Sequence, residues 1–238
     1  MILDQIYTHK CGHIASAFSI VEVLLTLYWR VLKMNDTNPN WPGRDRLILS
    51  KGHGVSALYA ILADLGFFPK EWLTASQDGN LLGGHADIKV PGIDWSTGSL
   101  GHGLSVAAGM ALAAKMDKED YRVFCLLGDG ELQEGSMWEA AMFAAMHRLT
   151  NLVAIIDCNN YQSCGKTEEI IKIWPLSDKW SAFGWCPYMV DGHNFEKLQT
   201  AFDSRVLSKD RPNVIIALTE KGHGVSFIEL DSKWHTGV

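Results

Sequence analysis

An aspartate between two glycines and an asparagine thirty residues later point most directly to chemistry. Asp129 stands in the segment LLGDGELQEG, and Asn159 stands in IIDCNN. Carboxylate and amide oxygens are hard ligands, which suit Mg²⁺ or Ca²⁺ and suit zinc poorly. Gly128 and Gly130 leave room for a diphosphate to approach the backbone N–H groups, and a helix beginning there would add its N-terminal dipole. The pattern predicts a divalent cation held against a diphosphate.

Short apolar runs come directly before both residues and predict the strands that position them. RVFCLL at 122–127 and LVAIID at 152–157 are typical of buried strands, and the segment 134–149 between them has a helical pattern. Parallel strands joined by a helix end at the same edge of a sheet, where ligands bind in open α/β folds. The sequence therefore predicts that Asp129 and Asn159 meet at this edge.

Strand-like and helix-like segments alternate along the rest of the chain. A third strand is predicted at 213–219, and further helices are predicted at 19–33, 55–65, 103–116 and 194–207, the last with Asn194 as its N-cap. This order indicates an α/β fold with a doubly wound parallel sheet flanked by helices. Long Gly-, Pro- and Asp-rich loops are expected at 36–46 and 77–98. Because no interdomain linker is apparent, we expect residues 1–238 to form a single domain.

The composition excludes several classes of protein. The chain has 238 residues, 47% of them hydrophobic, and a net charge of −6 without a run of Lys or Arg, which argues against nucleic acid or an anionic membrane as a partner. Five cysteines without a C-x-x-C pair favour reduced thiols. The N-terminus is too charged for a signal peptide, and the apolar run VEVLLTLYW is too short to span a bilayer. We expect a cytoplasmic protein.

Two glycine-containing segments resemble nucleotide-binding motifs but fail on spacing. CGKT at 164–167 resembles the end of a P-loop, yet Asn160 stands where that motif needs its first glycine. GSLGHGLSVAAG at 98–109 opens a predicted helix, but its glycines do not follow the G-x-G-x-x-G spacing. Neither segment is interpreted as a nucleotide site.

The longer motif resembles a known family. GDG followed by about thirty residues and NN is similar to the thiamine diphosphate motif, and GDGELQEGSMWEA resembles its transketolase version. Other motifs follow in the order of that family, namely CGH, RLILSKGHGVSALYAIL, GGHADIKVPGIDWSTGSLGHGLSVAAGMALA, DGHNFEKLQTAF and KGHGVSF…WH. The chain therefore resembles the diphosphate-binding (PP) domain of transketolases, as found where the enzyme is split between two genes.

This resemblance implies a set of site residues. Metal ligands would be Asp129, the Asn159 side chain and the Tyr161 carbonyl. The residues implied to contact thiamine diphosphate are His53, Gly98, Ser99, Leu100, Gly130, Glu131 and Asn159. His13, His85 and His235 would face the reacting carbon and the sugar hydroxyls, where imidazoles can transfer protons near neutral pH. Glu134 would lie at a subunit interface, although it could equally serve only the helix dipole.

The resemblance also implies the reaction and the partner. The protein would be the N-terminal subunit of a two-component transketolase, which moves a two-carbon ketol unit from a ketose or ketose phosphate to an aldehyde. The pyrimidine-binding and C-terminal domains are absent from these residues, so a C-terminal subunit would supply them in a heterotetramer containing a self-dimer. Two alternatives remain at this point, the α subunit of a 2-oxo acid dehydrogenase and a non-catalytic subunit that binds thiamine diphosphate.

The sequence departs from the family pattern at three places. GHIASAFS stands where the family has GHPGG, and His102 and His223 stand where other residues are usual. The first two changes lie near the expected substrate channel, so they put the usual sugar-phosphate donor in doubt. His9, His147 and His193 are interpreted as ordinary surface or core histidines, and the role of His223 is open.

Overall fold

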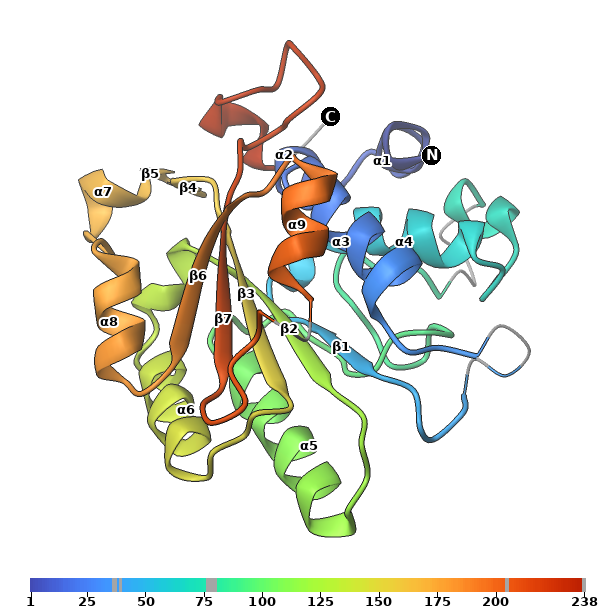
Figure 1. The fold of residues 1–238 in the computed structure, drawn as a ribbon. Coiled ribbons are helices and arrows are strands. Elements are labelled where there is room, and N and C mark those ends of the chain that lie inside the picture. Colours follow the sequence, from blue (N-terminus) through green and yellow to red (C-terminus); the bar gives the residue numbers. More distant parts are fainter. Residues whose placement is uncertain (36–37, 39, 76–80, 204–205, 237–238) are drawn as a thin grey trace.

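Five parallel strands form the centre of the protein (Figure 1). The computed structural model describes residues 1–35, 38, 40–75, 81–203 and 206–236. In spatial order, the strands are β1 (Arg46–Leu49), β2 (Val123–Gly128), β3 (Leu152–Cys158), β7 (Asn213–Leu218) and β6 (Cys186–Asp191). A short antiparallel hairpin, β4 (Tyr161–Gln162) with β5 (Gly165–Lys166), follows β3. The sheet is therefore the all-parallel one that the alternating pattern predicts.

Helices cover both faces of the sheet (Figure 1). One face carries α3 (Val21–Thr26), α4 (Val55–Asp64) and α9 (Phe195–Ala201), and the other carries α5 (Gly103–Asp117), α6 (Gly135–Met146) and α8 (Leu176–Ala182). Side chains alternate along each strand, so that Phe124 and Leu126 pack toward the first group and Cys125 and Leu127 toward the second. Because both faces are covered, the central strands are apolar throughout, which is typical of a doubly wound sheet.

The remaining helices are short. Before β1 the chain forms α1 (Ile2–His9), α2 (Ile14–Phe18) and a π-helical turn at Leu27–Val31. Single 3₁₀ turns lie at Gly52–Gly54, Lys70–Leu73, Gly130–Gln133 and Ser232–His235, and α7 (Thr167–Ile170) follows the hairpin. The 3₁₀ turn at Gly130–Gln133 separates the end of β2 from α6. The helix predicted at 134–149 is α6, which ends at Met146, and a 3₁₀ turn rather than a long helix follows Asp129 directly.

Most predicted elements are confirmed, but two strands of the central sheet were not predicted. The three predicted strands correspond to β2, β3 and β7, and Asn194 caps α9 by accepting the N–H of Lys197. The prediction for 194–207 was too long, because α9 ends at Ala201. The edge strands β1 and β6 were not predicted. The apolar run of β1 is only three residues long, and β6 contains Pro187 and exposes Tyr188 and Met189.

The predicted loops and the apolar N-terminal run complete the fold. Parts of the loops at 36–46 and 77–98 lie outside the described residues, and 40–45 and 81–98 contain only turns, bends and irregular chain. The run VEVLLTLYW lies within the helical stretch Ile14–Val31, which is long and apolar enough by length and composition to cross a membrane. However, 61% of this stretch is buried within the protein. Its packing is that of a core helix.

Candidate functional site

An open cleft of about 330 Å³ lies at the carboxyl edge of the central strands. Most residues predicted for the site line this cleft, namely His13, His53, His85, Gly98, Leu100, Asp129, Gly130, Glu131, Asn159, Tyr161 and His235. Ser99 is exposed between two of these residues and does not line the cleft itself. The fold thus brings together residues from seven separate stretches of the chain, between positions 13 and 235, at the edge where α/β sheets bind ligands.

Asp129 and the Asn159 segment meet directly. The Asp129 carboxylate is buried, with 1% of its surface exposed, and accepts the backbone N–H of Gly130 at 2.7 Å and that of Asn160 at 2.5 Å. Asn160 adopts a left-handed backbone with φ of 62°, which turns the chain at the end of β3 toward the aspartate. The two segments therefore meet as strand order predicts, although the hydrogen bond to Asp129 comes from Asn160, and the Asn159 side chain is bound by Asp157.

A buried ion pair beneath the cleft orients the Asn159 amide. Asp157 is fully buried and pairs with Lys51, while Ser19 donates to it at 2.7 Å and Thr219 at 2.5 Å. Burial by itself would raise the pKa of Asp157, but the charge of Lys51 and these donors outweigh it and hold the pKa below its usual value. Because an ionised carboxylate only accepts hydrogen bonds, the Asn159 Nδ2 must face it, as the distance of 2.8 Å confirms.

The residues fit a divalent cation and a diphosphate. Within the described residues, Asp129 takes part in no ion pair, and burial together with the charge of Asp157 raises the pKa of its carboxyl to about 7. A cation would remove this penalty, and the Asn159 Oδ1, which faces away from Asp157 and accepts the Tyr161 N–H at 3.0 Å, would be a second hard ligand. At Gly130 a Cβ would stand 2.9 Å from the Cβ of Gln162, so the close approach requires glycine. In this structure the Gly130 N–H is bound by Asp129, and its contact with a diphosphate stays a prediction.

Four histidines from separate segments line the cleft as one cluster. The His13 ring centroid lies 5.1 Å from that of His53, 5.7 Å from His85 and 5.4 Å from His235. Burial, followed by the neighbouring cations, lowers the pKa of His13 and His53 below the usual histidine value, and lowers that of His235 to about 3. These three imidazoles are therefore neutral at physiological pH, so each can donate or accept a hydrogen bond without carrying charge.

Glu131 connects the glycine segment of β2 with the loop that precedes α5. Its carboxylate is buried and accepts the Ser50 hydroxyl, the Gly101 N–H at 2.9 Å and the Gly128 N–H at 3.1 Å. Burial raises the pKa of this carboxyl. The side chain therefore holds the 98–101 loop beside Asp129, and direct cofactor contact by Glu131 stays a prediction.

Two buried lysines belong to the site and were missed in the sequence. Lys51 lines the cleft and pairs with Asp157, and Lys221 lies beside His235 with its Nζ 2.8 Å from the ring Nδ1. Both side chains are almost fully buried. A signal was available, because the hexapeptide KGHGVS occurs at 51–56 and again at 221–226. Each copy brings a buried lysine to the site, and of the two histidines in these copies His53 lines the cleft whereas His223 does not.

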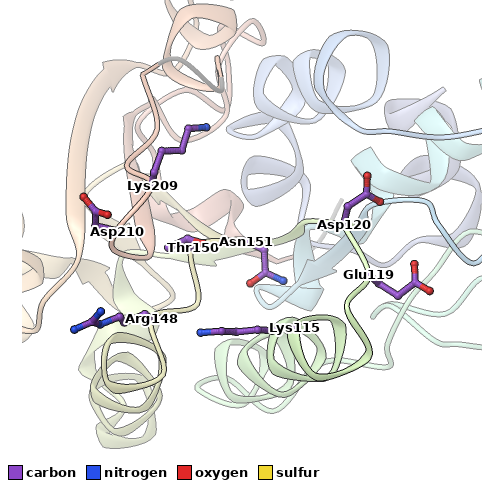
Figure 2. Close-up of a pocket in the computed structure, with 8 residues that line it drawn as sticks. All are labelled: Lys115, Glu119, Asp120, Arg148, Thr150, Asn151, Lys209 and Asp210. Carbon is purple, nitrogen blue, oxygen red and sulfur yellow. The ribbon is translucent and has the colours of Figure 1, made fainter.

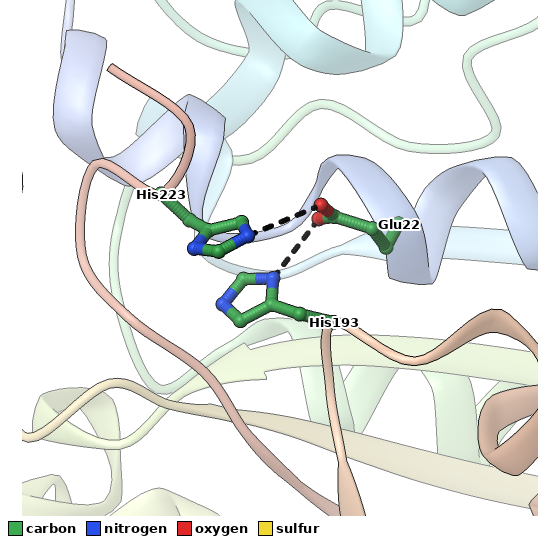
Figure 3. A group of neighbouring side chains, drawn as sticks. All are labelled: Glu22, His193 and His223. Atoms are coloured by element: carbon green, nitrogen blue, oxygen red, sulfur yellow. Dashed lines mark hydrogen bonds and ion pairs between the residues drawn. The ribbon is translucent and has the colours of Figure 1, made fainter. Parts of the chain in front are cut away.

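Glu22, His193 and His223 connect the loop that follows β7 to α3 (Figure 3). His193 Nδ1 lies 3.1 Å from Glu22, and the ring of His223 stacks on that of His193 with centroids 3.6 Å apart. The backbone N–H of Glu220 donates to His193 Nε2 at 2.8 Å, so the ring proton is on Nδ1 and points to Glu22. A protonated Nδ1 has no lone pair for a metal. Hydrogen bonds and ring stacking therefore hold these three side chains together, and the geometry does not suit a metal centre. The role of His223, which the sequence left open, is to stack on His193 in this group.

A second pocket, of about 380 Å³, lies at the opposite edge of the sheet (Figure 2). Its side chains mix charges, and three of them are already bound by other groups of the protein, among them Asp120, which pairs with Lys33 at 3.0 Å. Lys115 donates to the carbonyl of His147 at 2.8 Å, and Asn151 donates to the carbonyl of Ala111 at 3.0 Å. Because its charged groups do not converge on one point, this pocket does not compete with the cleft as a functional site.

The remaining predicted positions are placed as follows. Glu134 is exposed at the start of α6 on the rim of the cleft, and its role at a subunit interface stays a prediction. His102 precedes α5 and is exposed outside the cleft lining. The CGKT segment forms the β4–β5 hairpin and the first residue of the four-residue α7, which is not the loop and long helix of a P-loop.

Comparison with known proteins gives a consistent result. The family model described as transketolase, thiamine diphosphate binding domain, matches residues 1–237. The chain is 47% identical over 231 residues to the 6-deoxy-6-sulfo-D-fructose transketolase subunit SqwG of Clostridium sp. (strain MSTE9), covering 96% of this chain and 84% of that relative. It is 44% identical over 238 residues to a subunit of the apulose-4-phosphate transketolase of Phocaeicola vulgatus, covering 100% of this chain and 85% of that relative.

A solved structure extends the comparison to a longer chain. Transketolase from Leishmania mexicana superposes with a TM-score of 0.92 at 29% identity, covering 99% of this chain. The present chain spans only 37% of that structure, whereas it spans more than four fifths of the two subunit relatives.

Proposed function

Because the chain belongs to the transketolase family through its thiamine diphosphate binding domain, we propose that it is the N-terminal subunit of a two-component transketolase. It takes part in the transfer of a two-carbon ketol unit from a ketose to an aldehyde acceptor. The observation that carries this proposal is the meeting of Asp129 and the Asn160 N–H at the carboxyl edge of β2 and β3, beside a cluster of four histidines.

Separate residues of this chain would bind the metal ion and the cofactor. Asp129, the Asn159 Oδ1 and the Tyr161 carbonyl would hold Mg²⁺ or Ca²⁺, and the backbone near Gly130 would face the diphosphate. His53, Gly98, Ser99, Leu100 and Glu131 are the further residues assigned to the cofactor. When bound, thiamine diphosphate supplies the carbon nucleophile for cleaving and forming bonds next to a carbonyl.

The histidine cluster serves the sugar. His13, His85 and His235 line the cleft around the space next to the proposed cofactor position, where they would bind hydroxyl groups and move protons to or from their oxygens. His13 and His235 are neutral near pH 7, so each ring can donate an N–H hydrogen bond to a substrate oxygen that becomes negative. The open cleft excludes water only after a second polypeptide covers it.

The names of two relatives support a partner subunit. The relatives from Clostridium sp. and Phocaeicola vulgatus, over four fifths of whose length this chain aligns, are named as subunits of transketolases. The partner would carry the pyrimidine-binding domain, and two copies of each subunit would form a heterotetramer with a self-dimer of this chain near Glu134. The location proposed for this assembly is the cytoplasm.

The substrate class is a ketose with a polar or charged end. The two relatives are named for 6-deoxy-6-sulfo-D-fructose and for apulose 4-phosphate, which carry a sulfonate and a phosphate. The 2-oxo acid dehydrogenase alternative is not supported, because the family match and the relatives are transketolases. The histidine cluster suits the hydroxyl groups of a sugar, which a 2-oxo acid lacks.

Mixing experiments test the proposal. The purified subunit, the candidate partner and their mixture are assayed for ketol transfer from a ketose phosphate to an aldehyde, with Mg²⁺ and thiamine diphosphate present. We expect activity only in the mixture, and size-exclusion chromatography with light scattering should give the mass of a heterotetramer. Full transfer by this chain alone would refute the split enzyme. Conversion of pyruvate rather than a ketose by the mixture would refute the reaction.

A further inference from the structure

The loop after β7 approaches the site at two positions fourteen residues apart, Lys221 and His235. The Lys221 side chain is 1% exposed, and its Nζ lies 2.8 Å from His235 Nδ1 and 3.5 Å from the Gln162 carbonyl. His235 itself lines the cleft. The buried ammonium therefore reaches the imidazole from behind the cleft.

The backbone around Lys221 holds this position. The Gly222 N–H donates to the Ala15 carbonyl at 3.0 Å, and the Leu230 N–H donates to the Lys221 carbonyl at 2.9 Å. Gly222 has a φ of 80°, and a Cβ on it would stand 2.7 Å from the Ile228 carbonyl oxygen, so this turn requires glycine. Both polar groups of the peptide unit between Lys221 and Gly222 are therefore hydrogen-bonded, which fixes the backbone from which the lysine side chain reaches His235.

The chemistry of the two groups determines the position of the ring proton. A lysine ammonium has three donors and no acceptor, so His235 Nδ1 must accept. A neutral imidazole carries one proton, which then resides on Nε2. We propose that Lys221 is a positioning residue that fixes His235 as the Nε2–H tautomer, which makes it a hydrogen-bond donor to oxygen in the cleft.

The electrostatics agree with this arrangement. Burial and then the charge of Lys51 lower the pKa of Lys221 to about 8, so the amine is mostly protonated at neutral pH. Burial, Lys221 and His13 lower the pKa of His235, so the ring stays uncharged. The consequence for catalysis rests on the proposed function: His235 would donate to an oxygen of the sugar or of the diphosphate, and would not act as the base on Nε2.

The two copies of KGHGVS differ in what their lysines do. Lys51 pairs with Asp157 and donates to the Ser16 carbonyl at 3.1 Å, whereas the shortest hydrogen bond of Lys221 within the described residues is the one to His235. Lys51 therefore stabilises the fold next to the proposed metal site. Of the two lysines, Lys221 is the one that contacts His235 and sets its tautomer.

Nitrogen-15 NMR of the labelled subunit tests the proposal directly. Long-range ¹H–¹⁵N spectra distinguish the two neutral tautomers, and the His235→Gln variant assigns the signals. In the wild type we expect the Nε2–H form to exceed the Nδ1–H form by about tenfold or more at pH 7. In Lys221→Met this ratio should fall by about tenfold and the His235 pKa should rise. Lys221→Arg should retain the Nε2–H form, and Lys233→Met, which removes an exposed charge two residues from His235, should change neither quantity.

Several outcomes would overturn the assignment. An Nδ1–H form in the wild type, or an unchanged tautomer ratio in a folded Lys221→Met, would each refute it. If Lys221→Met does not fold, titration of the wild type decides, because the Nε2–H preference should weaken above about pH 8 as Lys221 loses its proton. The spectra need neither substrate nor partner, so a missing transketolase activity with the expected tautomer would refute the proposed function and leave this inference standing.

Discussion

The backbone N–H of Asn160 donates to the Asp129 carboxylate at 2.5 Å, although 31 residues separate them in the chain. The contact exists because β2 and β3 are parallel neighbours, with Gly128 paired to Asp157 in register, so their carboxyl ends coincide. It keeps a carboxylate buried at the point where a cation would be bound. The carboxylate, the turn at Asn160 and the Asn159 amide therefore form one unit, which the first prediction addresses.

Asp129→Ala should abolish Mg²⁺-dependent binding of thiamine diphosphate while the fold is retained. Removing one of few oxygen ligands to an ion that holds a diphosphate should lower affinity by about two orders of magnitude or more. Isothermal titration of thiamine diphosphate into the assembled variant measures this, with circular dichroism as the check on folding. Asp210→Ala, at the pocket on the opposite edge of the sheet, is the matched control. Unchanged affinity in Asp129→Ala would remove the metal assignment.

His85→Ala should lower turnover by about 10²–10⁴-fold, the usual range for loss of a general acid or base. The ring lines the cleft 5.7 Å from that of His13, and makes none of the contacts around Asp129. Cofactor affinity should therefore change little. Steady-state kinetics and titration separate the two effects, and His147→Ala, which alters an exposed histidine at the end of α6 outside the cleft, should keep wild-type turnover. Wild-type turnover in His85→Ala would make it an ordinary surface residue.

Lys51→Met should destabilise the protein by about 3–5 kcal/mol, because it leaves the buried Asp157 carboxylate without its cation. The double variant Lys51→Met/Asp157→Asn should lose less than the two single variants combined, since no buried charge remains. Urea unfolding measures all three free energies. Lys197→Met, which breaks an exposed pair with Asp191, should cost no more than about 1 kcal/mol. If Lys51→Met lowered the free energy of unfolding no more than Lys197→Met does, the stabilising role of the Lys51–Asp157 pair would be contradicted.

The stability of the protein should depend on Lys221 at alkaline pH. Its pKa is about 8 in the folded state against 10.5 for the free group, so between these values the unfolded chain binds more protons. The free energy of unfolding contributed by this lysine therefore rises with pH across that window, by about 3 kcal/mol at most. The difference in unfolding free energy between wild type and Lys221→Met, measured from pH 7.5 to about pH 10, should show this rise. A difference that stays constant with pH would mean that Lys221 titrates normally.

Part of the site could be predicted from sequence because it depends on local rules. Strands that end at a common edge place the residues that follow them together, which was enough to join Asp129 with Asn159. Glycines and histidines in recognisable motifs identified His13, His53, His85 and His235, and the structure gathers these four rings within 5.1–5.7 Å of their neighbours. The central strands were found because burial on both faces makes them continuously apolar.

Tertiary structure decided what depends on the path of the chain between elements. The edge strands β1 and β6 were missed because partly exposed or very short strands lack a distinct pattern. The pairing of Lys51 with Asp157 joins residues 106 positions apart, and the contact of Lys221 with His235 requires the loop to turn back on itself. A lysine in a sequence is interpreted as solvated unless its partner is known, since burying a charge is costly until a second charge or an acceptor compensates for it. The sequence alone determined which residues could hold a cation and a diphosphate, and only the folded chain decided which buried groups set their charge, orientation and protonation.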